Sequence, residues 1–365
     1  MNHHLPPEWH PQQVVLLSFP RRGGDYGELS IPTARQHLDL CATICQYTPV
    51  ILVLSDQKLF NQVWTERNEK EVRGPENIRF DRIIYAFRYP LYLVYLDTND
   101  VWARDFGPIT IIENGRATVC DFTFNGWGEK YPAELDNAVT RGLVARAILY
   151  GAQYNPLPLV LEGGSIESDG AGTVMSTSKC LFHTRRNSHH SREELIMLLK
   201  RFLGIRQLLL LDYGHLENDD TDGHIDTLAR FAPGNVIVYQ ACDDPDDEHY
   251  NEFQRMAQQL ATFKNTEGVN YELLPLPWPS PVYSQEDRRR LPASYANFLI
   301  TNGAVIVPAI DKKSDPEAVA VLQRAFPDRS IVLQSADFLL EQHGSIHCLT
   351  MQIPAIPGCP VVPSV

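Results

Sequence analysis

The stretch Glu217-Asn218-Asp219-Asp220-Thr221-Asp222-Gly223-His224-Ile225-Asp226 places one histidine among carboxylates, next to a turn-forming glycine. Carboxylates orient an imidazole and hold cationic nitrogens, so the cluster suits a proton carrier in a pocket for a positively charged group. The spacing from Asn218 to Gly223 also imitates the start of a calcium loop, but Ala229 stands where the bidentate glutamate belongs. For this stretch alone, a solvated acidic turn without chemistry stays open.

Outward from this stretch, the chain repeats one order of predicted elements: two strands, a helix and a third strand. After His224 come strand-like runs at 228–231 and 236–239, a helix at 248–263 and a strand near 270–274. Four further units are predicted to begin at the strand 14–19, the run 92–96, Glu162 and the strand 297–300, with a closing strand at 346–350.

These units indicate an α/β fold of five ββαβ-like repeats around a central site. They share no clear sequence identity, so the repeat is one of architecture. Asp105, Glu162 and His224 recur at intervals of roughly sixty residues, each where a unit begins a strand or turn. Equivalent corners of successive units would bring them together at a central axis. No linker or low-complexity segment divides the chain, which predicts a single domain over residues 1–365.

Composition excludes several classes of protein. The 365 residues carry a formal charge of -13, whereas a nucleic-acid-binding face must be basic. No apolar run approaches the length of roughly 20 residues that a membrane span needs, and the first residues lack the apolar core of a signal peptide. The seven cysteines are an odd number scattered along the chain, which fits a reducing compartment. We therefore expect a cytoplasmic protein.

The cysteines do not predict a metal site. Cys41 and Cys45 lie on the apolar stripe of a predicted helix and read as core thiols. No Cys/His group shows zinc spacing. The sequence thus predicts neither structural nor catalytic metal.

A candidate nucleophile stands near the end of the chain. Cys348 lies in Gly344-Ser345-Ile346-His347-Cys348-Leu349-Thr350, where turn residues run into an apolar segment. Taken singly, it could equally be a core thiol, as an acid beside an arginine is usually a structural ion pair. Other polar stretches that scaffold alone explains poorly are Asn99 to Asp105, Leu161 to Ser165 and Leu291 to Asn297.

The order of these motifs resembles the agmatine deiminases and related bacterial peptidylarginine deiminases, within the guanidine-modifying superfamily of the pentein fold. The resemblance spans nearly the whole chain. It is carried by Pro7-Glu8-Trp9, Trp102 to Pro108, Phe124 to Gly128, Leu161 to Ile166, Asp220 to Asp226, Leu291 to Phe298 and Ile346-His347-Cys348.

The resemblance implies a five-bladed α/β propeller and a role for each matched residue. Cys348 would be the nucleophile, His224 the proton carrier and Glu162 the acid that supports it. Asp105 and Asp226 would grip the guanidinium. The product would form through an S-alkylthiouronium intermediate on the cysteine, without a metal or organic cofactor.

The resemblance favours agmatine as substrate, giving N-carbamoylputrescine. Agmatine ends in an amine, and Trp102 and Asp220 are candidates to receive it. Departures from the agmatine enzymes at Phe106, Glu167-Ser168 and His343-Gly344-Ser345 leave open arginine or peptidyl-arginine as substrate, with citrulline as product. Amidino transfer and noncatalytic guanidine binding are further alternatives. A homo-oligomer stays open too.

Overall fold

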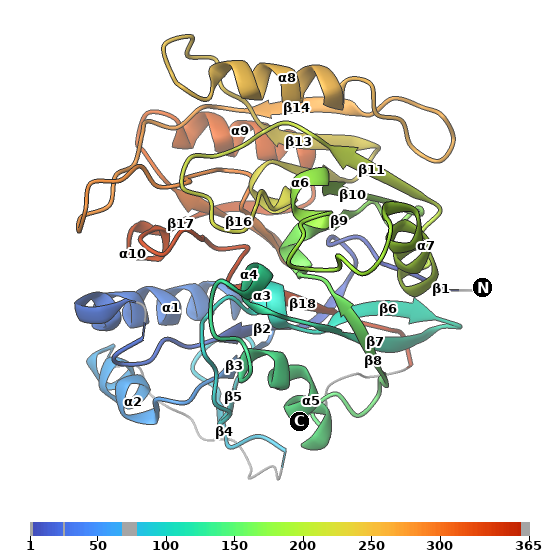
Figure 1. Cartoon of the computed structure of the whole chain (residues 1–365). Coiled ribbons are helices and arrows are strands. Elements are labelled where there is room, and N and C mark those ends of the chain that lie inside the picture. Colours follow the sequence, from blue (N-terminus) through green and yellow to red (C-terminus); the bar gives the residue numbers. More distant parts are fainter. Residues whose placement is uncertain (1–2, 25, 68–78, 359–365) are drawn as a thin grey trace.

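The backbone of the computed structural model forms five small mixed sheets (Figure 1). It describes residues 3–24, 26–67 and 79–358. Four sheets repeat the predicted order, in which two antiparallel neighbours are followed by a helix and then a parallel strand. This is the five-unit α/β architecture that the sequence predicts.

The first sheet runs in the order β18, β2, β3, β5 and β4, and the other four follow along the chain. The strands of the first sheet are β18 (Thr350–Pro354), β2 (Gln12–Ser18), β3 (Val50–Val53), β5 (Leu91–Val94) and β4 (Arg82–Ile84). Those of the next two sheets are β1 (His3–His4), β6 (Ile109–Glu113), β7 (Arg116–Thr123) and β8 (Gln153–Val160), then β9 (Ile166–Ser168), β10 (Thr173–Thr177) and β11 (Gln207–Leu211). Those of the last two are β12 (Ala229–Ala232), β13 (Val236–Gln240) and β14 (Glu272–Leu276), then β15 (Leu299–Ile300), β16 (Ala304–Ala309) and β17 (Ser330–Ser335).

The longer helices lie beside and between the sheets, and α9 contacts both β14 and β17 (Figure 1). The α-helices are α1 (Ser30–Ile44), α2 (Gln57–Glu66), α3 (Ala103–Phe106), α4 (Gly126–Glu129), α5 (Val139–Ala145), α6 (Ser178–Leu181), α7 (Arg192–Leu203), α8 (Tyr250–Leu260), α9 (Asp315–Ala325) and α10 (Asp337–Leu340). Local chemistry fixes their ends, as α7 illustrates. Ser191 forms a capping box with Glu194, and Gly204 ends the helix in the left-handed conformation.

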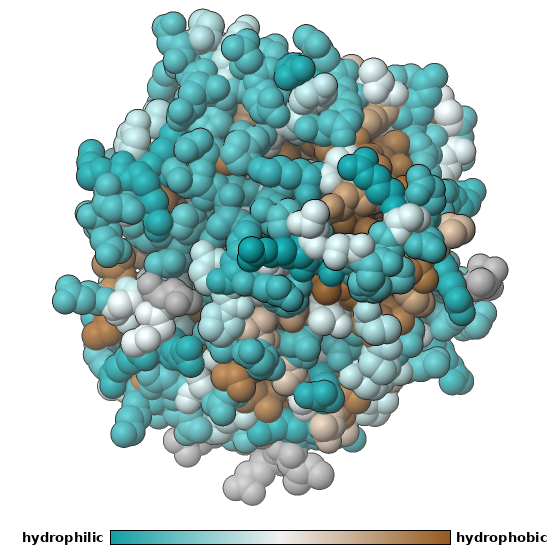
Figure 2. Space-filling view, in the orientation of Figure 1, coloured by the Kyte–Doolittle hydropathy of each residue, from teal (hydrophilic) through white to brown (hydrophobic). Residues whose placement is uncertain are grey.

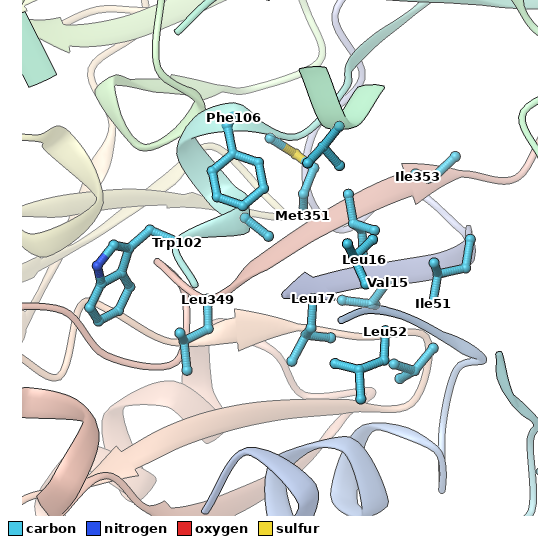
Figure 3. Packing of buried hydrophobic residues seen from close by; sticks show 14 of the residues in the cluster. Val15, Leu16, Leu17, Ile51, Leu52, Trp102, Phe106, Leu349, Met351 and Ile353 are labelled. Atoms are coloured by element: carbon cyan, nitrogen blue, oxygen red, sulfur yellow. The ribbon is translucent and has the colours of Figure 1, made fainter. Parts of the chain in front are cut away.

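The first sheet closes the series by joining the two ends of the chain. β18 pairs with β2 in antiparallel register, with Met351 opposite Leu16. Figure 3 shows Leu16, Leu17 and Met351 in one cluster where these two strands run side by side. Because Cys348 and Leu349 belong to the same buried cluster, the segment just before β18 is anchored in the core of the first sheet.

Two predicted elements differ from the structure. The run 92–96 was expected to open the second unit, but β5 pairs in parallel with β3 and belongs to the first sheet. A short run buried on both faces gives no sign of its pairing partner, which explains the error. The closing strand, expected at 346–350, begins only at Thr350. The residues before it form a turn, since the amide of Leu349 donates to the carbonyl of Ser345.

The face seen in Figure 2 is mostly hydrophilic, with apolar side chains in separate groups. Among the described residues, no helix combines the length and apolar character required to cross a membrane.

Candidate active site

Cys348 lies in the turn before β18, with 7% of its surface exposed. Its Sγ is 3.1 Å from Nδ2 of Asn297 and 3.5 Å from Oδ2 of Asp226. Burial raises the pKa of the thiol well above its ordinary range, and the charges of Asp226 and Asp105 raise it further. Without a cation in the site, Cys348 is therefore a thiol at neutral pH.

The thiol borders a cavity of about 540 Å³. The lining combines carboxylates with aromatic rings, and no lysine or arginine is among the described residues that form it. These residues are Asp100, Trp102, Asp105, Trp127, Tyr131, Asp219, Asp220, Thr221, Asp226, Thr227, Gln342, His343, Gly344 and Cys348. Such a wall attracts a cation and repels an anion.

Asp226 is held by a hydrogen bond on one oxygen only. Its Oδ2 lies 2.8 Å from Nδ1 of His347, whereas its buried Oδ1 has no hydrogen-bond partner among the described residues. Burial alone would raise the pKa of Asp226, but the hydrogen bond and the charge of His347 lower it. Asp226 is thus a buried anion with one oxygen free to accept a hydrogen bond from a ligand.

Asp105 faces the same cavity from α3. Its Oδ1 accepts a hydrogen bond from the amide of Gly164 at 3.0 Å, and its Oδ2 accepts one from Nε1 of Trp127 at 2.8 Å. Burial raises the pKa of Asp105 to about 6, with the neighbouring Asp226 adding to the shift and His224 opposing it. Ionisation of this carboxyl therefore depends on the charges around it.

His224 lies behind Asp105. It is about 1% exposed, and it is not among the residues that line the cavity. Its Nδ1 is 3.6 Å from Oδ1 of Asp105, and its Nε2 is 3.9 Å from Oε2 of Glu162. Burial alone would lower its pKa, but Asp105, Cys180 and Glu162 raise it well above the ordinary value. The ring is therefore a cation at neutral pH.

Glu162 in turn is fixed by an arginine. Nε of Arg186 donates to both of its oxygens, at 2.9 and 3.0 Å, and Nη1 of Arg186 donates to Asp222 at 2.7 Å. Burial would raise the pKa of Glu162, yet His224 and Arg186 lower it. A carboxylate held in this way keeps a negative charge at a fixed position beside the imidazole of His224.

Gly164 is where these groups come closest. A β-carbon added there would lie 2.7 Å from Nδ1 of His224, 2.8 Å from Oδ1 of Asp105 and 3.0 Å from Oδ2 of Asp226. Any larger residue would thus intrude on all three side chains. This crowding shows that the histidine and the two carboxylates surround one small volume.

The structure brings the predicted site residues together in two layers. Cys348, Asp105, Asp226, Trp102 and Asp220 line the cavity. His224 and Glu162 form the layer behind it, through the contacts with Asp105 described above. Trp102 packs on Gly344, where a β-carbon would lie 2.3 Å from the indole ring. Asp220 accepts a hydrogen bond from the hydroxyl of Tyr131 at 2.9 Å.

Of the positions that depart from the agmatine enzymes, His343 and Gly344 lie at the cavity. His343 lines it, and its Nδ1 is 2.7 Å from the carbonyl of Asn218. Glu167 instead pairs with Arg230 at 2.8 Å, and Phe106 packs against Phe124. These two positions act on the scaffold and not on the cavity wall.

Sequence reasoning missed the group behind Asp226. Nε2 of His347 is 2.8 Å from Glu8, whose carboxylate also binds Arg104 at 2.8 Å and contacts Arg230. Burial would raise the pKa of Glu8, but the two arginines hold it well below its usual range. Glu8 and His347 both fall inside motifs of the resemblance, which is the only signal that could have marked them.

Glu8 and Arg104 also border a second cavity of about 550 Å³. The described residues that line it do not include Cys348.

A model of the Porphyromonas-type peptidyl-arginine deiminase family matches residues 4–354. The chain belongs to this family. It is a guanidino-group hydrolase of the agmatine deiminase family with the pentein fold. The family assignment agrees with the resemblance drawn from the sequence motifs.

Three relatives of the deiminase show the range of the family. Agmatine deiminase of Ectopseudomonas mendocina is 32% identical, covering 97% of this chain and 96% of its own. A substrate-bound cysteine-to-serine variant of C. jejuni agmatine deiminase is 34% identical with a TM-score of 0.84, covering 96% of each chain. A solved protein of Porphyromonas gingivalis, provisionally assigned as an arginine deiminase, is 40% identical with a TM-score of 0.84, covering 96% of this chain and 98% of its own.

Proposed function

We propose that this deiminase hydrolyses agmatine to N-carbamoylputrescine and ammonia through a covalent adduct on Cys348. The observation that carries the proposal is the cavity at the thiol, whose wall holds aspartates and aromatic rings. Relatives at 32 and 34% identity are agmatine deiminases, one of them solved with substrate bound, which supports the same reading.

In the proposed complex, Asp105 and Asp226 pair with the nitrogens of the guanidinium. A guanidinium presents its N–H donors in a plane, so two carboxylates fix both its position and its orientation. The unpartnered Oδ1 of Asp226 supplies one acceptor. Held in this way, the central carbon of the guanidinium lies face-on to Sγ of Cys348, as attack requires.

The bound cation also prepares the nucleophile. Two carboxylates raise the pKa of Cys348, and a guanidinium between them cancels that effect. Sγ then gives its proton to solvent and attacks the guanidinium carbon, which becomes tetrahedral. Substrate binding and thiolate formation are thereby coupled.

His224 then acts as acid and base. Because its pKa is raised, the imidazolium holds a proton to give to the departing nitrogen, which leaves as ammonia. The remaining S-alkylthiouronium is attacked by water, whose proton returns to His224. Collapse of that second adduct, with loss of its hydroxyl proton to solvent, frees the thiolate and the ureido product.

The wall of the cavity favours an amine over a carboxylate. Asp219 and Asp220 lie in its wall, and Trp102 supplies an aromatic face, so an ammonium finds both an anion and a π-system there. The carboxylate of free arginine would meet repulsion from the same residues. Lys130, which binds Asp222 at 2.9 Å, is the nearby cation that would have to turn inward to offset it.

A second candidate is deimination of arginine or peptidyl-arginine to citrulline. It is favoured by the Porphyromonas gingivalis relative, which at 40% identity exceeds the two agmatine enzymes above. A peptide-borne arginine has no free carboxylate next to its side chain when the residue is internal, so the acidic wall would tolerate it.

A colorimetric assay of ureido product separates these candidates. Agmatine, free arginine and peptides with internal or terminal arginine are compared at equal concentration. We expect kcat/KM for agmatine to exceed that for each of the others by at least about a hundredfold, since repulsion or lost pairing at a buried charge costs a few kcal/mol. Turnover confined to the arginine compounds would contradict the agmatine assignment.

Replacement of the nucleophile tests the covalent route. Cys348→Ala and Cys348→Ser should release no ammonia from agmatine while circular dichroism stays unchanged, because a hydroxyl in this acidic site is a far weaker nucleophile than a thiolate. Cys120→Ser, at a buried thiol of β7, is the matched control and should remain active. Retained turnover by the two Cys348 variants would refute the adduct.

A further inference from the structure

Three buried side chains next to the cavity bring metal-ligating atoms together. Glu162, Cys180 and His224 each offer one atom, and these atoms lie within 4.8 Å of one another. Sγ of Cys180 is 4.0 Å from Oε2 of Glu162, and Nε2 of His224 is 3.9 Å from the same oxygen. Thiolate, imidazole and carboxylate are the donors that Zn²⁺ takes in proteins.

A second observation concerns the ring nitrogens of His224, which face the carboxylates of Asp105 and Glu162 at 3.6 and 3.9 Å, beyond hydrogen-bond length. Neither ring nitrogen of His224 has a hydrogen-bond partner among the described residues, although the side chain is about 1% exposed. Buried polar atoms are nearly always paired, because an unpaired one loses its hydration without compensation. Nε2 is therefore left to bind a ligand between the three donor atoms, and the space between these atoms is called the gap below.

The scaffold holds Cys180 at this gap. Thr177, which precedes α6, accepts a hydrogen bond from the amide of Cys180 at 3.3 Å. The same hydroxyl donates to the carbonyl of Gly223 at 2.6 Å, one residue before His224. The thiol and the imidazole are thus positioned by one shared side chain, which keeps their separation fixed.

The charges around the gap favour a cation. Glu162 faces it directly, and Asp105 lies 3.6 Å from the other nitrogen of His224. Arg186 opposes this attraction, but it divides its donors between Glu162 and Asp222. Each carboxylate oxygen has two lone pairs, so Oε2 of Glu162 keeps one for a metal.

We propose that Glu162, Cys180 and His224 form a binding site for a thiophilic divalent cation of the Zn²⁺ class, with water as fourth ligand. Bond lengths to zinc are about 2.0 to 2.3 Å, so the three donors would draw inward by a fraction of an ångström. Binding releases the thiol proton of Cys180 and the imidazolium proton of His224 to solvent. The ion displaces protons and is not oxidised or reduced.

The consequence for turnover rests on the proposed function. A cation on Nε2 leaves His224 as a neutral imidazole whose remaining proton, on Nδ1 beside Asp105, is held far more tightly than a proton of the imidazolium, so the ring no longer protonates the departing ammonia. The site is therefore inhibitory, and the ion acts reversibly without touching the nucleophile. Because protons compete for the same atoms, the cation binds more tightly as the pH rises.

Cobalt titration of the Cys348→Ala protein tests the binding without relying on activity. Co²⁺ occupies zinc sites, and its bond to a thiolate gives a charge-transfer absorption band. We expect one equivalent of Co²⁺ to produce this band in Cys348→Ala. Adding Cys180→Ser should remove the band and weaken binding by about tenfold or more. Adding Cys242→Ser, at another buried thiol, is the matched control and should leave both unchanged.

X-ray absorption of the zinc-loaded Cys348→Ala protein provides a readout that needs no change at position 180. One sulfur and several nitrogen or oxygen neighbours are expected. A zinc shell without sulfur, or a cobalt band that survives in folded Cys348→Ala/Cys180→Ser, overturns the proposal. If the unaltered protein fails to convert agmatine yet Cys348→Ala gives the band, the proposed function fails and the metal site stands.

Discussion

At the residue scale, we expect the ionisation of Asp105 to limit activity at low pH. Burial raises the pKa of this carboxyl to about 6, and only the ionised form can pair with a guanidinium. A raised carboxyl pKa means that the charge is present above that value and is lost as the pH falls through it. We therefore expect kcat/KM for agmatine to decline below pH 6, in proportion to the ionised fraction.

A pH profile of kcat/KM reports the free enzyme and checks this directly. Circular dichroism at each pH serves as the control for folding. A profile that stays level down to about pH 5 would show that Asp105 is not the group that limits binding.

Gly164→Ala is expected to impair catalysis more than folding. The new β-carbon would approach His224, Asp105 and Asp226 within 2.7 to 3.0 Å, so these side chains must move. Displacement of reacting groups by about 1 Å costs about a hundredfold in rate. Steady-state kinetics with agmatine measures this loss.

Gly142→Ala is the control for the glycine substitution. Gly142 lies in α5, where the added carbon meets only the flexible end of Leu96. Alanine is the better helix former there, so rate and stability should be retained. Equal activity of the two variants would mean that the crowding at Gly164 has no catalytic role.

At the scale of elements, the turn before β18 carries a histidine that positions the carboxylate of Asp226, which is proposed to bind the substrate. His347 joins Asp226 to Glu8 through contacts of 2.8 Å on each ring nitrogen. Removing a hydrogen bond to a buried charge costs about 1 to 3 kcal/mol. His347→Gln should therefore raise KM for agmatine by about tenfold or more and affect kcat less.

His249→Gln is the matched control for His347→Gln. His249 is also buried, and its Nδ1 contacts Asp247 at 2.8 Å, but it does not line the substrate cavity. Its loss should lower stability and leave KM unchanged. Calorimetric binding of agmatine to Cys348→Ala, with and without His347→Gln, separates weakened binding from slowed chemistry.

Arg230 of β12 ties several elements together, and its charge is fully buried. Its side chain pairs with Glu167 and contacts Glu8, and it also donates to two backbone carbonyls. Arg230→Met removes the buried cation that Glu8 and Glu167 share, which costs about 3 to 5 kcal/mol. Urea unfolding should show this loss.

The exposed ion pair of Arg324 with Glu272 supplies the comparison. These side chains are 68% and 62% exposed, so Arg324→Ala should cost less than about 1 kcal/mol. Similar losses for Arg230→Met and Arg324→Ala would show that the buried network contributes little to stability.

Elements with their own local signals were predictable, and pairings between distant segments were not. The helix expected at 248–263 is present as α8 (Tyr250–Leu260), because its apolar period lies within one short stretch. The partner of β5 was not predictable, since a run of four buried residues fits either neighbouring sheet. The candidate site shows the same difference. Sequence motifs identified Cys348 and His224, but the contact between His347 and Glu8 joins positions 339 residues apart and gives no local signal.

For the whole molecule, pairing of β18 with β2 predicts that the five sheets unfold together. Buried free cysteines report on three of them: Cys41 in α1, Cys120 in β7 and Cys242 after β13. In rising urea, all three should become reactive toward a thiol reagent at one midpoint, which coincides with the loss of circular dichroism. Mass spectrometry of labelled peptides measures each thiol.

Reaction of one of these thiols at a clearly lower urea concentration would contradict a single transition. It would mean that a sheet opens by itself while the others remain folded. Stability would then have to be assigned sheet by sheet.

The seam between β2 and β18 also bears on biosynthesis. A ribosome makes β2 among the first strands and β18 as the last described strand. The edge of β2 that pairs with β18 therefore stays unpaired with it through most of translation. The carboxylates of the site are all made before Cys348, which lies in the turn just before β18. A partly translated chain therefore holds no complete pocket, and activity begins only when β18 pairs with β2 to complete the first sheet.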